Sequence, residues 1–124
     1  MTKCIRGSVV LSIVVTHAGC GKPISDPTVR HAPSFTRDVR PILSKHCFSC
    51  HGEDEDLQNG LDLRELSRIL AGGVSGPAVI PGNPKESLLY EMILLDEMPP
   101  EDDKLISAEK ELIRRWLANN RLQE

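Results

Sequence analysis

Two cysteines and a histidine stand close together in the stretch KHCFSCHG, residues 45–52. Cys47 and Cys50 are three positions apart, and His51 directly follows the second cysteine. Thiols at this spacing can ligate zinc, form a disulfide, cycle as a redox dithiol or carry a covalently bound haem. The histidine favours the last of these, because C-x-x-C-H is the attachment signature of c-type haem.

The other three chemistries each lack a feature that they require. Of the four cysteines, Cys4 and Cys20 lie in the N-terminal segment, so Cys47 and Cys50 are the only pair in the rest of the chain. A structural zinc site usually takes four ligands from two such pairs. A thioredoxin-like dithiol needs a βαβ context, and no alternating strand pattern surrounds the motif. A disulfide here would close too short a loop to stabilise the fold much.

The spacing also has a geometric reason. Residues at i, i+3 and i+4 share one face of a helix, so Cys47, Cys50 and His51 can converge on one flat ring. The two thiols would form thioethers with the haem vinyl groups, and the imidazole would reach the iron. We therefore expect one covalently bound haem c.

An electron-carrying haem iron usually has a second Met or His ligand, and four residues are candidates. Met92 falls in an apolar helical stripe, so we expect it mainly to pack in the core. Met98 lies just past that stripe and before two prolines that hold the backbone extended, where a thioether can point inward or simply plug the loop. His46 is attached on the side of the cysteines, and His31 lies in a proline-rich stretch where a solvated ring is expected. Met98 is the predicted ligand, and Met92 is the alternative.

These residues need a scaffold, and the sequence predicts a small all-α domain. Only 3% of the residues are aromatic, which is little for a core that closes without a cofactor. Apolar residues at helical spacing predict about four short helices, which we expect to wrap around the haem. They are predicted to begin near Asp38, near Asp62, at Asn83-Pro84 and at Ser107, and the second is expected to end at Gly72-Gly73. The expected core residues are Phe35, Val39, Ile42, Leu43, Leu63, Leu66, Ile69, Leu70, Leu88, Leu89, Met92, Ile93, Leu112, Ile113, Trp116 and Leu117.

The N-terminus has the features of a secretory signal over residues 1–19. Lys3 and Arg6 precede an uncharged apolar run that is too short to span a bilayer but fits a signal peptide. We therefore expect export, with a periplasmic or membrane-anchored location. The small residues before Cys20 resemble a bacterial lipobox, although His17 departs from it, so lipid attachment at Cys20, ordinary cleavage nearby and an uncleaved tail all stay open. Residues 20–33 are predicted to form a proline-rich tether, and residues 34–120 the monohaem domain.

The net charge of the chain indicates which kinds of partner it can bind. Removing residues 1–19 takes away two positive charges, which leaves 13 basic residues against 18 acidic ones and a net charge of −5. Nucleic-acid-binding proteins present basic surfaces, so this balance argues against a nucleic-acid partner. An acidic surface fits a basic docking patch on a partner protein, although a charge of this size is also ordinary for solubility.

Several blocks of the sequence occur in the order found in a known family. The segments FTRDVRPILSKHCFSCHG, GLDL, GGVSGPAVIPGNPKESLLYEMI and MPPEDDKLISAEKELIRRWL, over about residues 35–118, resemble the planctomycete-type cytochrome c domain. The resemblance implies that Cys47 and Cys50 bind haem covalently, that His51 is the proximal iron ligand and that Met98 is the distal one. It also implies the fold of small class I cytochromes c, with the first and last helices packed across each other. The family commonly has Gly-Ala where this chain has Asn119-Asn120, which affects only the expected end of the last helix.

The expected function follows from the axial ligands. With both axial positions filled by protein side chains, the iron changes charge without binding oxygen or peroxide, so we expect a non-enzymatic electron carrier that works with a redox protein partner. If Met98 detaches, a peroxidase-like haem enzyme or a ligand sensor is the alternative. A third hypothesis is a lipoprotein adaptor without haem, which would be colourless when purified.

Overall fold

The structure is a computed structural model that describes residues 31–124 except residues 54, 101 and 123. The predicted signal over residues 1–19, Cys20 and most of the predicted tether over residues 20–33 lie outside the described residues. The described residues belong to one compact unit, His31–Glu124. No helix in this part of the chain has the length and apolar character needed to cross a membrane.

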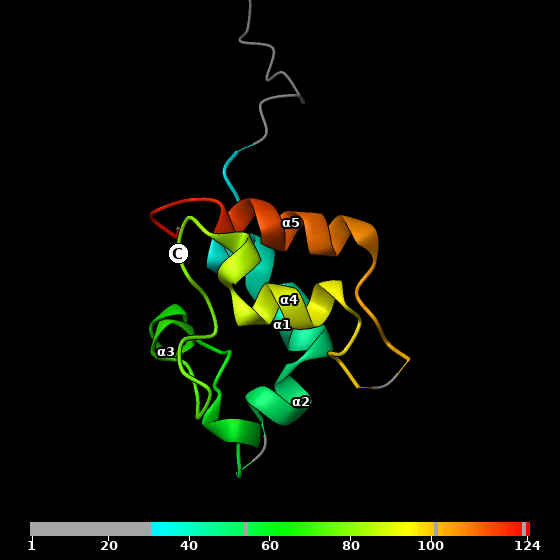
Figure 1. Cartoon of the computed structure of the whole chain (residues 1–124). Coiled ribbons are helices and arrows are strands. Elements are labelled where there is room, and N and C mark those ends of the chain that lie inside the picture. The colour runs from blue at the N-terminus through cyan, green and yellow to red at the C-terminus, as the bar shows by residue number, and fades with distance from the viewer. Residues whose placement is uncertain (1–30, 54, 101, 123) are drawn as a thin grey trace, which may run out of the picture. The chain divides into compact units, whose positions relative to one another are not determined.

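The described part of the chain is helical and contains no β-strand, which confirms the predicted all-α fold (Figure 1). An isolated backbone bridge joins Gly73 and Gly76. The five α-helices are α1 (Arg40–His46), α2 (Phe48–His51), α3 (Leu66–Ala71), α4 (Leu88–Leu94) and α5 (Ser107–Leu117). A π-helical turn, η1 (Phe35–Val39), precedes α1, and two 3-10 turns, η2 (Gln58–Gly60) and η3 (Pro84–Glu86), lie between the later helices.

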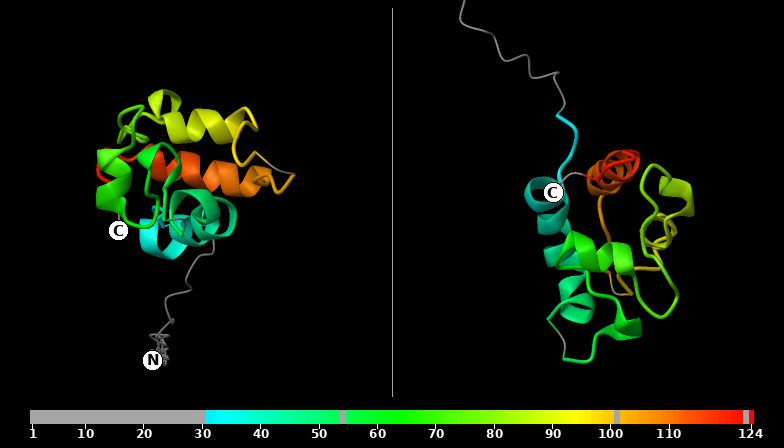
Figure 2. Two further views of the ribbon diagram at one scale, coloured as in Figure 1. Left: turned by 90° about the horizontal axis from the view of Figure 1, so that it is seen from below. Right: turned by 90° about the vertical axis from the view of Figure 1, so that its left-hand side faces the viewer.

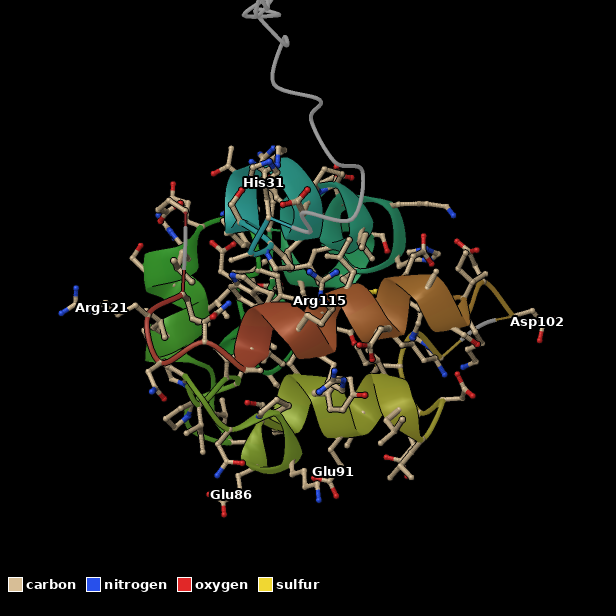
Figure 3. All side chains as sticks on the ribbon, turned by 90° about the horizontal axis from the view of Figure 1, so that it is seen from above. His31, Glu86, Glu91, Asp102, Arg115 and Arg121 are labelled. Carbon is tan, nitrogen blue, oxygen red and sulfur yellow. The ribbon has the colours of Figure 1, made fainter. Side chains whose placement is uncertain are left out.

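Helix α5 is the centre of the core. It lies between η1 and α1 on one side and α4 on the other (Figures 2 and 3). The apolar face of α5 carries three completely buried residues, Ile113, Trp116 and Leu117. The ring centroids of Phe35 in η1 and Trp116 lie 5.9 Å apart, and the two rings are tilted by 33°. The first and last helical elements therefore pack against each other, as the family resemblance implied.

The first helical element begins earlier than the sequence predicted. Ser34, not Asp38, is the N-cap: its Oγ accepts a hydrogen bond from the backbone N–H of Arg37 at 3.4 Å. Asp38 acts from inside the first turn, where its carboxylate accepts from the backbone N–H of Ser34 at 2.8 Å. This reciprocal pair resembles a capping box, so the prediction that Asp38 caps the helix is wrong.

The predicted cap at Asp62 is also wrong, because its carboxylate binds arginines and α3 begins only at Leu66. Asp62 is buried; it accepts from the backbone N–H of Arg64 at 3.0 Å and pairs with the guanidinium groups of Arg64 at 2.8 Å and Arg68 at 3.0 Å. The side-chain hydrogen bond from Arg64 is the main reason that the pKa of Asp62 is lowered to about 2. The end of α3 is as predicted, since Gly72 has a left-handed φ of 75°.

We expect Asp62→Asn to remove a pH-dependent part of the stability. The folded-state pKa of about 2 lies below the ordinary value of 3.8, so ionised Asp62 favours the folded state. This contribution is fully present above about pH 5 and is lost as the pH falls towards about 2. Both arginines are about half exposed and therefore screened, so we expect a loss of only about 1–2 kcal/mol at neutral pH. Urea unfolding of both proteins at about pH 7 and pH 2.5 measures it. A stability difference of equal size at both pH values would contradict this assignment.

Helix α4 begins later than predicted. Asn83 and Pro84 open the short turn η3, and the chain then leaves the helical path at Ser87, which is the N-cap of α4. The buried Ser87 Oγ accepts from the backbone N–H of Ile80 at 2.9 Å and donates to the carbonyl oxygen of Asn83, also at 2.9 Å. Ser87 thus joins the apolar loop before α4 to the start of the helix.

Candidate functional site

The cysteine–histidine motif forms a single helical turn. Cys47 stands at the junction of α1 and α2, where its φ of −127° bends the chain while its N–H still donates to the carbonyl oxygen of Leu43 at 2.8 Å. The N–H groups of Cys50 and His51 then donate to the carbonyl oxygen of Cys47 at 3.2 Å and 2.9 Å. The local helix that the spacing requires is therefore present.

Two cavities, each of about 170 Å³, adjoin this turn. Cys47, His51 and Met98 line both of them, so the motif and the predicted sixth ligand border the same two cavities. The first cavity has mainly apolar walls, formed by Leu61, Leu63, Val74, Ala78, Leu88, Leu89, Met92 and Ile93, together with Asn59 and Ser75. The second is more polar and includes Lys45, His46, Ser49, Cys50, Gln58 and Asp103. An apolar wall beside a polar one suits a flat, mainly apolar group with charged edges.

The side chain of His51 lacks a partner that the described residues could supply. Its Nδ1 atom is buried and makes no hydrogen bond, the only such side-chain nitrogen or oxygen atom found among the described residues. Buried polar groups are almost always paired, so this ring is suited to hold something other than the polypeptide. The backbone of His51 is fixed, because its carbonyl oxygen accepts from the N–H of Leu63 at 2.8 Å.

The two thiols are free to react. No disulfide joins Cys47 and Cys50, and both side chains are half-buried. Burial, reinforced by the neighbouring Cys50, raises the pKa of the Cys47 thiol to about 11. Within the described residues, no group of three His, Cys, Asp or Glu side chains is placed to hold a metal ion. Two half-buried thiols that are not joined to each other and lie beside a largely apolar cavity fit thioether formation with an apolar group.

The four candidates for a sixth ligand differ in their burial, in their contacts and in the cavities that they line. Met98 is half-buried on the loop after α4 and lines both cavities, whereas Met92 lines only the first, from within α4. His31 is exposed, and its carbonyl oxygen accepts from Arg115 at 3.4 Å on the face shown in Figure 3. Both ring nitrogens of His46 contact residues elsewhere in the fold, as described below. Of the four candidates, Met98 is thus the one that lines both cavities together with Cys47 and His51.

The sequence patterns did not predict one part of the wall of the first cavity, the contact between Asn59 and Val74. Asn59 adopts a left-handed φ of 54° in η2, and its carbonyl oxygen accepts from the N–H of Val74 at 2.8 Å. A Cβ atom at Gly73 would collide with that same carbonyl group, so glycine permits the close approach. The Asn59-Gly60 dipeptide signals a turn, but nothing in the sequence shows which later segment the turn would contact.

The comparisons with known proteins agree with this geometry. Residues 47–102 match the family model described as Planctomycete cytochrome C. The matched segment begins at Cys47 and contains Cys50, His51 and Met98. No curated protein and no solved structure matches the chain. The match covers the motif, the residues shared by both cavities and the first part of the loop after α4, and it supports a planctomycete-type cytochrome c domain in this segment.

Proposed function

We propose that this protein is a monohaem c-type cytochrome that carries single electrons between redox partners outside the cytoplasm. The observation that carries the proposal is that Cys47, His51 and Met98 border both cavities beside one helical turn. In the proposed arrangement Cys47 and Cys50 hold the haem covalently, His51 is one axial ligand of the iron and Met98 is the other. A bound haem c supplies the one-electron redox change.

The polypeptide has three tasks in this function. Cys47 and Cys50 anchor the edge of the cofactor, and the fixed backbone of His51 sets the position of its ring. The apolar wall of the first cavity excludes water and disfavours extra charge. Met98 as a sixth ligand favours the reduced state more than a second histidine would. The apolar wall and the Met98 ligand both favour a carrier of relatively high reduction potential.

Met98→Ala tests the ligand assignment. In ferric holoprotein we expect this variant to lose the absorption band that arises from a thioether bound to iron, because no other side chain replaces the sulfur. The same variant is expected to lower the reduction potential, which redox titration measures. A retained band in Met98→Ala would remove Met98 from the proposed site.

Met92→Ala is the matched control. Met92 lines the first cavity as well, and the substitution removes a thioether of the same size from a half-buried position. We expect the band to persist and only the stability to fall, by about 2 kcal/mol or somewhat more. The opposite pattern, loss in Met92→Ala and retention in Met98→Ala, would assign the ligand role to Met92.

The location and partner are part of the proposal. The apolar run after Lys3 and Arg6 supports export, and Cys20 provides a residue for lipid attachment. Mass spectrometry of the mature protein would report the first residue, any lipid on Cys20 and the mass of one haem together. We propose a redox protein as the partner, and the excess of acidic residues favours one with a basic docking surface.

A further inference from the structure

We propose that His46 is a positioning residue that holds the loop carrying Met98 against the haem-binding turn. This loop, residues 95–106, is called the Met98 loop below. The inference rests on the proposed function, in which Met98 is the sixth ligand. It assigns a role to a buried histidine that stands beside the cysteine motif but has its ring directed elsewhere.

The ring of His46 is almost completely buried, with 1% of its side chain exposed, and it has partners on both edges. Nδ1 lies 3.0 Å from the carbonyl oxygen of Asp103 and 3.2 Å from the Oδ2 atom of the same residue. Both oxygens are acceptors, so Nδ1 is the donor. Nε2 lies 3.3 Å from the nearer carboxylate oxygen of Glu109. Because the ring is buried and the Glu109 carboxylate lies against Nε2, neither nitrogen is free to bind iron.

These contacts join three elements that are distant in sequence. His46 is the last residue of α1 and the neighbour of Cys47, Asp103 lies in the Met98 loop, and Glu109 lies in the first turn of α5. Glu109 also accepts from the backbone N–H of Ile106, at the end of the loop, at 3.0 Å. One imidazole therefore links the haem-binding turn to the loop and to the helix that follows the loop.

The near end of the loop is already tied to other elements. The N–H of Met98 donates to the carbonyl oxygen of Met92 at 3.2 Å, and Asp96 pairs with Lys110 of α5 at 2.7 Å. Further along, Lys104 donates to the carbonyl oxygen of Pro99, which closes the loop on itself and does not attach it to the motif. Asp102 projects outward at the tip (Figure 3), whereas the next residue, Asp103, binds His46.

In this arrangement the contacts of His46 hold the Met98 loop beside the motif. His46, Met98 and Asp103 all line the second cavity, so the loop borders the iron site on the side where His46 holds it. For Met98 to leave the iron, the loop must move away from the motif, and that motion breaks the bonds between His46 and Asp103. His46 therefore retains the sixth ligand and keeps external ligands out, which distinguishes a carrier from a sensor.

The test uses holoprotein carrying His46→Phe, which keeps a buried aromatic ring and removes both nitrogens. Two measurements are made: the rate at which carbon monoxide binds the reduced protein, and amide hydrogen exchange of the Met98 loop. We expect both to be about tenfold faster than in the wild type, which is the effect of losing roughly one or two buried hydrogen bonds. Asp62→Asn is the control, because it breaks a buried polar cluster outside the Met98 loop.

Two further variants keep the test decisive if His46→Phe does not fold. His46→Asn retains an N–H donor near the position of Nδ1 but cannot reach Glu109, so we expect an intermediate rate. Asp103→Ala removes a carboxylate from a largely exposed side chain and leaves the carbonyl bond, so we expect a smaller increase. Equal rates in the wild type and in every foldable His46 variant, or equal acceleration in Asp62→Asn, would overturn the inference.

The two proposals fail in different ways. If wild-type ferric protein lacks the thioether-to-iron band, Met98 is not the ligand and the proposed iron coordination fails. Amide exchange still reports on the contact between His46 and the loop in that case: faster exchange in His46→Phe supports the positioning role, and unchanged exchange rejects it. If the band is present and His46→Phe leaves both rates unchanged, only the positioning role fails.

Discussion

Replacing Cys47 and Cys50 together with alanine is expected to give a colourless and largely unfolded protein. Two cavities lie beside these thiols. Without a cofactor, the apolar side chains that line the cavities would stay uncovered. Covering apolar surface stabilises a fold by about 2.5 kcal/mol for every ~100 Å². This is a large term beside a total stability of about 5–15 kcal/mol, so losing the covalent haem removes much of what holds this small domain together.

Far-UV circular dichroism and the visible spectrum of the purified double variant measure this result. Ser49→Ala is the matched control, because Ser49 lies on the same helical turn between the two cysteines and is exposed. The control is expected to keep both the haem colour and the helical signal. A double variant with the full wild-type helical signal would show that the fold closes without haem, and a coloured one would show that the thiols are not needed to hold it.

Trp116→Ala is expected to have the largest effect of any single substitution in the core. Trp116 is completely buried in α5 and packs against Phe35, so truncation leaves a cavity between the first and last helical elements. Substitutions of this kind cost about 3–5 kcal/mol. Denaturant unfolding of the holoprotein, followed by circular dichroism, gives the change in the free energy of unfolding.

Leu94→Ala provides the comparison for Trp116→Ala. Leu94 belongs to α4 but is 53% exposed, so its removal should change the free energy of unfolding by less than about 0.5 kcal/mol. If Trp116→Ala cost no more than this control, α5 could not be the centre of the core.

The spacing of apolar residues was the feature of the sequence that predicted the fold best. The expected core residues Phe35, Val39, Ile113 and Trp116 are all buried, because one face of a helix must be covered whatever its exact ends are. Leu70 is 40% exposed, since α3 is too short to turn its whole apolar stripe inward. The starts of the helices were predicted less well. They depend on which of several polar side chains bonds a particular N–H. Asp38 and Asp62 bond other groups, and Asn83 stands at the start of η3 without a side-chain capping bond.

The residues of the candidate site also differ in how well local sequence patterns predict them. Cys47, Cys50 and His51 could be selected from local spacing, since the chemistry is contained within one helical turn. The bond between His46 and Asp103 could not, because 57 residues separate them and no local pattern links the two. The same holds for the contact between Asn59 and Val74, which depends on how the chain folds back after η2. Long-range polar contacts are set by the tertiary fold, and these two fix residues that line the cavities.

The position of α5 has a consequence for the order in which the molecule matures. Helix α5 follows both η1 and α4 in the chain, so these two elements have no common partner until α5 has been synthesised. Before that point, the apolar faces of η1 and α4 lack the helix that covers them in the folded chain. Docking of α5 is therefore the step that joins the first helical element to α4 and completes the core.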